Sequence, residues 1–396
     1  MYVEFMVGVL MTKLKDVFSL QITGEWGIEY TENETNTKVL RTTNFTPDGI
    51  INYSDVVLRC IHKDKVEKKK LRYGDIILEK SGGTEKTPVG RVVFCDESIE
   101  KDTYLCNNFT QAMRVNREIA VPKYVFYFMW NLHNSGKTEL LQNKTTGIRN
   151  LQVKSYLNEE IPLPPLDEQR KIVAVLDKVS DLIAKRRQQL TKLDELVKAR
   201  FVEMFGLGYS ESTLLSLCNI IDYRGKTPPK VDFGLPFITA KNIKMHHMTL
   251  EPKEYISKET YNKVMVRGFP REGDVVFTTE APLGNVCRIP HFDTEFYIGQ
   301  RIVTLQTTAL HPVYLEYALD TESFKQKIAE KSSGSTVTGI RVRLLEQLTI
   351  PVPPLKLQNQ FAGFVERIEK NKAAIICSLE KLERLKQALM QEYFGV

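Results

Sequence analysis

The chain has 396 residues, of which 42% are hydrophobic and 26% are charged, and this balance excludes a disordered or fibrous protein. The length predicts two or three domains with a substantial core. The formal net charge of +6, from 55 basic and 49 acidic residues, is too small to indicate one class of partner by itself.

The N-terminal segment and the cysteines indicate only where the protein works. Residues 1–10 are apolar but too short for a membrane span, and they lack the basic start of a signal peptide, so we assign them no function. The six cysteines include no CxxC pair, which argues against a zinc knuckle and a secreted disulfide framework. We therefore expect reduced thiols in a cytoplasmic protein that does not bind membranes.

Two kinds of sequence alternate along the chain. Residues 11–160 contain short β-branched and aromatic runs, such as GDIIL and GRVVF, separated by Gly, Pro and Asn, and they predict a strand-rich domain, head one. Residues 161–206 open with IPLPPLDEQ and predict a long helix. The same pair returns as head two in residues 207–349 and as a second helix in residues 350–396, which open with IPVPPLKLQ.

The two proline-rich openings belong to an internal duplication. An offset of 189 residues places Ile161 on Ile350 and aligns 161–206 with 350–395 without a gap. Upstream, YGDIIL at 73–78 aligns with EGDVVF at 272–277, and TTGIR at 145–149 aligns with TVTGIR at 336–341. Because prolines disfavour helix before them and preset φ for a first helical turn, we expect both helices to begin at these prolines.

Both helices show apolar residues near a seven-residue period. With Ile172 at position d, the period runs to Val197, and in the second helix it runs from Phe361 to Leu389. If the helices pair within one chain, the connectivity requires an antiparallel coiled coil with a pseudo-twofold axis. We predict an α+β fold in which helices about 57 Å long separate the heads, compared with about 34 Å for one turn of B-DNA.

The sequence contains none of the common signatures of catalysis or metal binding. It has no GxGxxG after a strand, no GxxxxGK[ST] loop, no amino-methyltransferase motif and no HExxH spacing. The neighbouring His246 and His247 are more typical of a polar loop than of a metal site. We therefore predict no catalytic and no metal-binding residues, and we expect catalysis to reside in another chain.

Several motifs together resemble a known family. Two heads alternate with two long helices that each begin with Pro-Pro-Leu-x-x-Gln, and head two carries DYRGKTPP, GDVVFTT and GSTVTGIR. This arrangement resembles the specificity subunit of type I restriction-modification systems, over residues 14–395. The resemblance implies that each head is a target recognition domain that reads one half of a split double-stranded DNA sequence.

The resemblance also implies partners. The helices would dock two methyltransferase subunits, which restriction and translocase subunits join, in the cytoplasm of a prokaryote. This chain would hold no cofactor, because S-adenosylmethionine is expected in the partner methyltransferase. The second copy departs from the pattern, since Leu357 stands where the first has a glutamate. The docking and spacer residues that the motif implies are Pro164, Pro165, Glu168, Gln169, Pro353, Pro354 and Gln358.

Candidate DNA contacts follow from side-chain chemistry in polar loops near glycines. For head one these are Arg41, Thr42, Asn44, Lys80 and Ser81. For head two they are Arg224, Lys226, Thr227, Lys241, Asn242, Thr278, Thr279 and Glu280. Candidate phosphate contacts are Lys144, Arg149, Ser335, Thr336 and Arg341. Each set has a structural alternative, because glycine-rich segments form turns and the asparagines can hydrogen-bond their own loop backbone.

Two other functions stay open at this point. The chain could be a stand-alone DNA methyltransferase or nuclease with degenerate motifs, which activity of the purified chain would establish. It could also be a coiled-coil scaffold whose heads bind protein. In that case the host would show no split methylated motif that depends on this chain.

Overall fold

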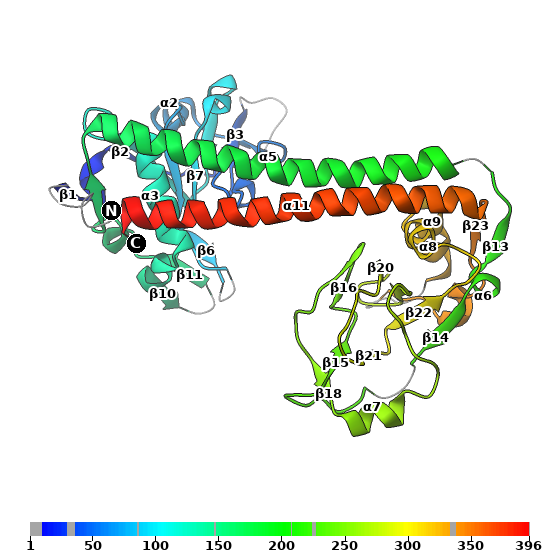
Figure 1. The fold of residues 1–396 in the computed structure, drawn as a ribbon. Helices are drawn as coiled ribbons and strands as arrows, with labels where there is room; N and C mark the ends of the chain where they lie inside the picture. Colours follow the sequence, from blue (N-terminus) through cyan, green and yellow to red (C-terminus); the bar gives the residue numbers. More distant parts are fainter. Residues whose placement is uncertain are drawn as a thin grey trace. The chain divides into compact units, whose positions relative to one another are not determined.

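The computed structural model describes residues 10–29, 36–84, 87–145, 148–206, 208–223, 227–332 and 338–395. The chain forms two compact units: unit 1 comprises Met1–Arg186 with Ser378–Val396, and unit 2 comprises Arg187–Cys377. Two helices of 40 residues each, α5 (Leu166–Phe205) and α11 (Leu355–Phe394), contribute one part to each unit (Figure 1). The mixture of strand-rich heads and two long helices confirms the predicted α+β fold.

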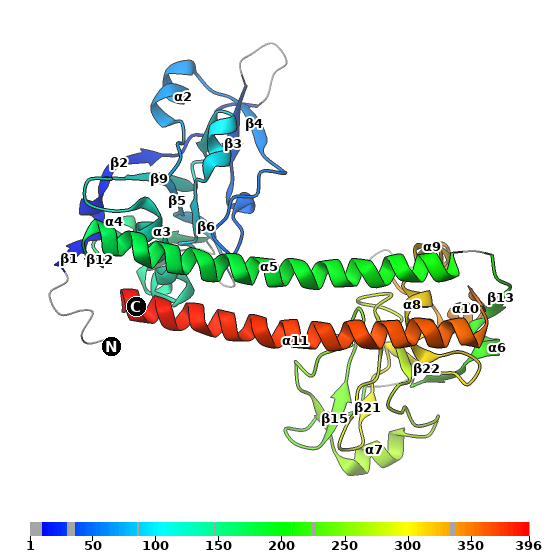
Figure 2. The same ribbon diagram turned by 45° about the horizontal axis from the view of Figure 1, so that its top comes forward.

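Head one is built around an antiparallel sheet whose two faces are both covered. The strand order is β2 (Phe18–Thr23), β9 (Thr110–Val115), β5 (Ile76–Glu79) and β7 (Val92–Phe94), and Figure 2 labels the first three strands. On β5, Ile76 and Leu78 share a core with helix α3 (Pro122–Asn134), while Ile77 belongs to a separate core on the other face. Burial on both faces explains why the three residues Ile76–Leu78 of GDIIL are all apolar.

Smaller elements complete unit 1. A second sheet has the order β4 (Val57–Cys60), β3 (Asn36–Leu40) and β8 (Tyr104–Cys106), with β3 and β8 parallel. A third contains β10 (Gln142–Thr145), β11 (Ile148–Leu151) and β6 (Ser81–Gly83), and β1 (Leu10–Lys13) pairs with β12 (Glu160–Leu163). The remaining helices are η1 (Leu14–Val17), η2 (Thr42–Asn44), α2 (Lys63–Lys69), η3 (Glu97–Lys101), η4 (Lys137–Leu141) and α4 (Val153–Tyr156).

Unit 2 repeats the main sheets of unit 1 in the same order and sense. The four-stranded sheet runs β14 (Asn219–Asp222), β22 (Ile302–Gln306), β19 (Val275–Thr278) and β20 (Val286–Arg288). The three-stranded sheet runs β18 (Tyr255–Ile256), β15 (Leu235–Ile238) and β21 (Tyr297–Ile298), again with one parallel pair. The remaining elements are β13 (Glu211–Thr213), α6 (Leu214–Leu217), β16 (Ile243–Lys244), β17 (His247–Met248), α7 (Lys258–Val264), α8 (Pro312–Leu319), α9 (Glu322–Lys331), α10 (Val342–Leu345) and β23 (Thr349–Pro351).

The repeated strand order confirms the duplication but corrects one part of its alignment. The Leu151 N–H donates to the Lys80 carbonyl at 2.8 Å, and the Ile340 N–H donates to the Thr279 carbonyl at 3.0 Å. Lys80 and Thr279 occupy the same position, directly after β5 and β19, so Leu151 corresponds to Ile340. The predicted match of TTGIR with TVTGIR was therefore wrong by three residues. The register is fixed by the buried side chains of Leu151 and Ile340, which occupy equivalent positions.

Each unit shows that the long helices pair in opposite directions. In unit 1, Ile172 near the start of α5 shares a core with Phe394 at the end of α11. In unit 2, Phe201 near the end of α5 shares a core with Phe361 near the start of α11. The antiparallel pairing is therefore confirmed within each unit. A charged seam residue has a partner too, since Lys372 Nζ lies 2.5 Å from Asp194 Oδ1.

A buried glutamine joins each head to its helix. Gln169 Oε1 accepts a hydrogen bond from the Val121 N–H at 2.8 Å, directly before α3, and Gln169 Nε2 donates to the Pro164 carbonyl at 2.8 Å. In unit 2, Gln358 bonds the His311 N–H at 2.8 Å and the Pro353 carbonyl at 2.7 Å. We call this arrangement the glutamine clamp. It gives the glutamine of the Pro-Pro-Leu-x-x-Gln motif a structural role.

Candidate functional site

The side chains of the predicted Asn44 and Asn242 hydrogen-bond the backbone of their own loops. The Oδ1 of Asn44 accepts from the Arg41 N–H at 2.8 Å, and its Nδ2 donates to the carbonyls of Asn52 and Asp55 at 2.9 and 2.8 Å. Both asparagines are buried, and Asn242 makes the equivalent three bonds to Thr239, Thr249 and Pro252. These bonds support the structural alternative, so we do not retain either asparagine as a base contact.

The other predicted contacts in these loops are more accessible. Arg41 is half-buried and its guanidinium forms an ion pair with Asp55 at 2.8 Å, while the Thr42 carbonyl accepts from Arg91 at 3.3 Å. Thr227 and Lys241 are exposed. Four predicted contacts lie outside the described residues, and for Lys144 only the strand backbone is described; the four are Arg224, Lys226, Ser335 and Thr336.

We call β5 and β19, which follow the Gly-Asp pairs of GDIIL and GDVVF, the Gly-Asp strands, and the loop after each strand the Gly-Asp loop. The residues at this point of the chain divide into buried and exposed ones. In head two, Thr278 is fully buried and its Oγ1 accepts from the Asn285 N–H at 2.9 Å, and Thr279 is buried beside it. Glu280 is the first residue of this loop whose side chain reaches the surface. The two threonines are therefore structural, and of the three predicted residues only Glu280 can contact a ligand.

In head one the same loop meets two other segments. Ser81 pairs with Asn150 of β11, and the Ser81 Oγ donates to the Asn150 Oδ1 at 2.5 Å. The carbonyl of Phe109 accepts hydrogen bonds from the N–H groups of Lys80 and Ser81 at 2.9 and 3.2 Å, and the Phe109 side chain is half-exposed. The structure thus brings the predicted Lys80, Ser81 and Arg149 into one region.

Head two has the same meeting point with different side chains. Glu280 forms an isolated antiparallel β-bridge with Gly339, and the Thr279 N–H donates to the Arg301 carbonyl at 2.9 Å. Arg301 Nε lies 2.9 Å from Glu280 Oε1. Ladder register makes the positions equivalent, because Glu79 faces Thr110 in head one and Thr278 faces Ile302 in head two. We call these three positions the corner; it comprises Ser81, Phe109 and Asn150 in head one and Glu280, Arg301 and Gly339 in head two.

Sequence reasoning missed four of the six corner residues. Phe109, Asn150, Arg301 and Gly339 lie in segments far along the chain from the Gly-Asp loop. A constant offset could not have found the pair at 109 and 301, because Asp75 and Asp274 are 199 residues apart whereas Phe109 and Arg301 are 192 residues apart. Only the pairing of strands shows which residues meet.

A histidine in head two lies among buried charges. His246 adopts φ of 62° between β16 and β17, and its ring nitrogens lie 2.9 Å from Glu316 on α8 and 3.1 Å from Asp320, which directly follows α8. Burial opposes the charged form, but the hydrogen bonds to the two carboxylates outweigh it and raise the pKa of His246 above 6.5. The neighbouring charges are Arg288, which bonds Glu316, and Lys198 and Lys325, which bond Asp320. This cluster holds the β16–β17 hairpin to α8.

The long helix α5 exposes apolar residues outside its pairing seam. Val175, Leu182 and Leu196 are 40%, 38% and 47% exposed, and their spacing of seven and fourteen residues places them on one side of the helix. Such side chains on a helix that already buries another stripe are typical of a surface that binds a further protein. We call Val175 and Leu182, which both belong to unit 1, the outer stripe.

The helix motif residues divide into buried and exposed groups. Pro164, Gln169, Pro353 and Gln358 are buried within their units, so we assign them to the junction between head and helix rather than to a partner surface. Pro165 and Pro354 are exposed. Glu168 forms an ion pair with Lys171 at 3.1 Å, whereas Leu357 packs against the core of unit 2.

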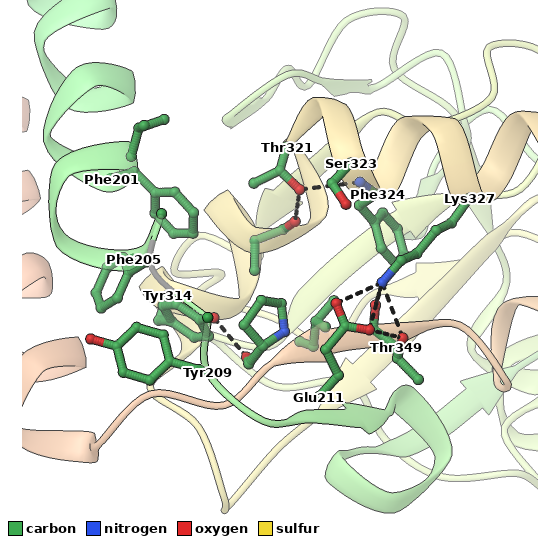
Figure 3. A pocket seen from close by; sticks show the side chains of 16 residues that line it. Phe201, Phe205, Tyr209, Glu211, Tyr314, Thr321, Ser323, Phe324, Lys327 and Thr349 are labelled. Carbon is green, nitrogen blue, oxygen red and sulfur yellow. Dashed lines mark hydrogen bonds and ion pairs between the residues drawn. The ribbon is translucent and has the colours of Figure 1, made fainter.

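Unit 2 contains a pocket of about 280 Å³ where α5, α8 and α9 meet (Figure 3). Phe201, Phe205 and Tyr314 form its apolar side. On its polar side, Lys327 Nζ lies 2.8 Å from Glu211 Oε2 and lowers the pKa of that carboxyl. Because these polar groups already bond one another, we interpret the pocket as a gap in the packing at the end of a helix and not as a reaction site.

Within the part of the chain that the structure describes, no group of His, Cys, Asp or Glu side chains is arranged to hold a metal ion. None of the described helices is long and apolar enough to cross a membrane.

Comparison with known proteins identifies consistent relatives. The family described as the type I restriction modification DNA specificity domain matches residues 6–193 and 208–386. The type I restriction enzyme MjaVIII specificity subunit of Methanocaldococcus jannaschii is 24% identical over 63% of this chain and 64% of its own length. The chain thus matches just under two thirds of that relative. The putative MjaX specificity subunit of the same organism is 21% identical over 83% of this chain and 80% of its length.

Two solved structures share the fold. A chain from a study of complex assembly and conformational transition of the type I R-M system has a TM-score of 0.55 and 21% identity, covering 98% of both chains. The S subunit of a type I restriction-modification system from M. genitalium has a TM-score of 0.56 and 14% identity, covering 98% of this chain and 96% of its own.

The raised pKa of His246 predicts a pH-dependent contribution to the stability of unit 2. Because the folded state binds this proton more tightly, the stabilisation is fully present below about pH 6.5 and is lost as the pH rises through the elevated folded pKa. We expect His246→Asn, which tolerates the positive φ, to lower the free energy of unfolding by about 1.5–3 kcal/mol at pH 6 and by less at pH 9. Denaturant unfolding of the full chain measures both values. His247→Asn, at the exposed neighbour, is the control; an equal loss at both pH values for His246→Asn would contradict the charge argument.

Proposed function

Because the chain belongs to the family of type I restriction-modification DNA specificity domains, we propose that it directs such a complex to a bipartite double-stranded DNA sequence, one half per head. The observation that carries this proposal is the duplicated framework, in which the strand order, the ladder register and the glutamine clamp recur in both units. Two copies of one DNA-reading fold in one chain suit a target with two halves.

The surface chemistry of the heads supports contact with DNA. Lys80 and Arg149 flank the corner of head one, and Arg341 flanks that of head two, where it is exposed. Basic side chains beside polar ones give phosphate contacts that position a protein next to the bases it reads. Lys144, Arg224, Lys226, Ser335 and Thr336 stay predictions of further contacts.

We assign the chain a recognition role without catalysis of its own. The supporting observations are the lack of catalytic motifs in the sequence and the match to a family described by DNA specificity. A partner methyltransferase would then hold S-adenosylmethionine and extrude the target base from the duplex. Modification or cleavage of DNA by the purified chain alone would favour the alternative of a stand-alone enzyme.

The outer stripe supports docking of the partner subunits. Its half-exposed apolar residues lie on α5, outside the seam with α11, where a helix of a second protein can cover them. We propose that two methyltransferase subunits bind the long helices, that restriction and translocase subunits join through them, and that the complex works in a prokaryotic cytoplasm.

Exchange of one head tests the function directly. We propose boundaries of 11–160 and 207–349 for the heads and 161–206 and 350–396 for the helix segments. We expect that replacing residues 11–160 with the head of another family member changes one half of the methylated motif and leaves the other half intact. The clamp tolerates this exchange because Gln169 bonds a backbone N–H of the head rather than a side chain. Sequencing of methylated adenine in cells that carry the system gives the motif, and a change in both halves or in neither would contradict the proposal.

A charge in the outer stripe tests docking. We expect Leu182→Glu to reduce binding of the methyltransferase subunit about tenfold or more, because it places a carboxylate in an apolar interface. Ala184→Glu adds the same charge two residues away at another exposed position of α5 and is the matched control. Affinity is measured with purified subunits, after circular dichroism shows that both variants fold. Equal binding by the two variants would exclude the outer stripe as the docking surface.

A further inference from the structure

The two corners share a backbone and differ in every side chain. In both heads the residue after the Gly-Asp strand bonds the carbonyl at position 109 or 301, at 2.9 Å in each case. The same residue accepts from the N–H at position 151 or 340, at 2.8 and 3.0 Å. On this common frame, head one presents Ser, Phe and Asn where head two presents Glu, Arg and Gly.

We propose that the corner is the base-reading element of each head, and that its three side chains set which base pair is recognised. Head two would select a G·C pair and head one an A·T pair, each through the major groove. The inference rests on the proposed function and assigns it to particular residues, four of which the sequence did not indicate.

The chemistry of head two matches a G·C pair. Guanine presents two acceptors, O6 and N7, to which an arginine donates in a bidentate manner, and cytosine presents the N4 amino group, which donates to a carboxylate. Arg301 and Glu280 already lie 2.9 Å apart, with side chains 52% and 41% exposed. They therefore offer donors and an acceptor side by side, as the two edges of a G·C pair require. Gly339 keeps this space open, because a Cβ there would lie 3.1 Å from the Glu280 Cβ.

The chemistry of head one matches an A·T pair. An asparagine side chain bonds adenine at N6 and N7, and an apolar side chain contacts the thymine methyl group. The hydrogen bond from Ser81 orients the Asn150 amide, and Phe109 is 47% exposed beside them. Neither charge of the head-two corner is present, so the two corners cannot select the same base pair by the same contacts.

The pattern of repetition distinguishes the corner from the buried junctions between head and helix. At the junctions the duplication keeps the side chain together with its bonds, as with Gln169 and Gln358, and as with Tyr124 and Tyr314, whose hydroxyls bond equivalent proline carbonyls at 2.8 and 2.7 Å. At the corner it keeps only the backbone. Two heads that read different half-sites must differ where they read, and a shared backbone lets the side chains change without moving the frame.

The test is the methylated motif of the full complex in cells. We expect Arg301→Ala to lower discrimination for G·C about ten- to hundredfold at one position of one half-site, with the other half unchanged. Arg301→Lys keeps the charge but loses the bidentate geometry, and Glu280→Gln keeps the shape but adds a donor, so each should relax the same position. Lys263→Ala is the control, because Lys263 pairs with Glu259 in another exposed ion pair of the same head, on α7 and away from the corner.

The reciprocal change transfers the preference. Ser81→Glu with Phe109→Arg and Asn150→Gly should convert the A·T position of the half-site read by head one to G·C. A wild-type chain that directs no split motif would overturn the proposed function and this inference together. A normal wild-type motif that Arg301→Lys and Glu280→Gln leave unchanged would overturn this inference alone, even if Arg301→Ala abolished methylation, because such a result marks a structural role.

Discussion

The glutamine clamp is the constraint on which the arrangement of each unit depends. It joins head to helix through two backbone groups, an N–H at the start of a head helix and a proline carbonyl, and leaving either unpaired costs about 1–3 kcal/mol. Because the clamp recognises backbone rather than side chains, it fixes the junction while leaving the sequence of the head free to vary. The proposed function, in which two heads on a constant framework read different DNA sequences, needs this property.

At the corner, too, the two heads share the backbone arrangement and differ in their side chains. Equivalent backbone hydrogen bonds hold positions 109 and 301 in the two heads, and the side chains there share no chemistry. The junctions themselves are not quite equal. Glu168 lies at the surface with Lys171, whereas Leu357 packs against the core of unit 2, so the carboxylate of the first junction has no counterpart at the second.

The sequence predicted those features that depend on local geometry. Proline stereochemistry and the seven-residue period located both long helices, and the apolar runs indicated strand-rich heads. The corner could not be predicted from the sequence, because it depends on which distant strands pair. The shared letters of TTGIR and TVTGIR gave an alignment that was wrong by three residues, because the buried Leu151 and Ile340 fix the register. Asn44 and Asn242 have the chemistry of base contacts, but only the structure shows that their bonds are used internally.

Under the proposed function, the two heads present the same corner to the two halves of one DNA site. The most direct measurement places a photo-crosslinking amino acid at position 109 or at position 301 and maps the cross-linked base on the recognised duplex. We expect position 109 to react with one half-site and position 301 with the other, while position 263 on α7 does not react with bases. Reaction of both positions with the same half, or equal reaction from position 263, would contradict it.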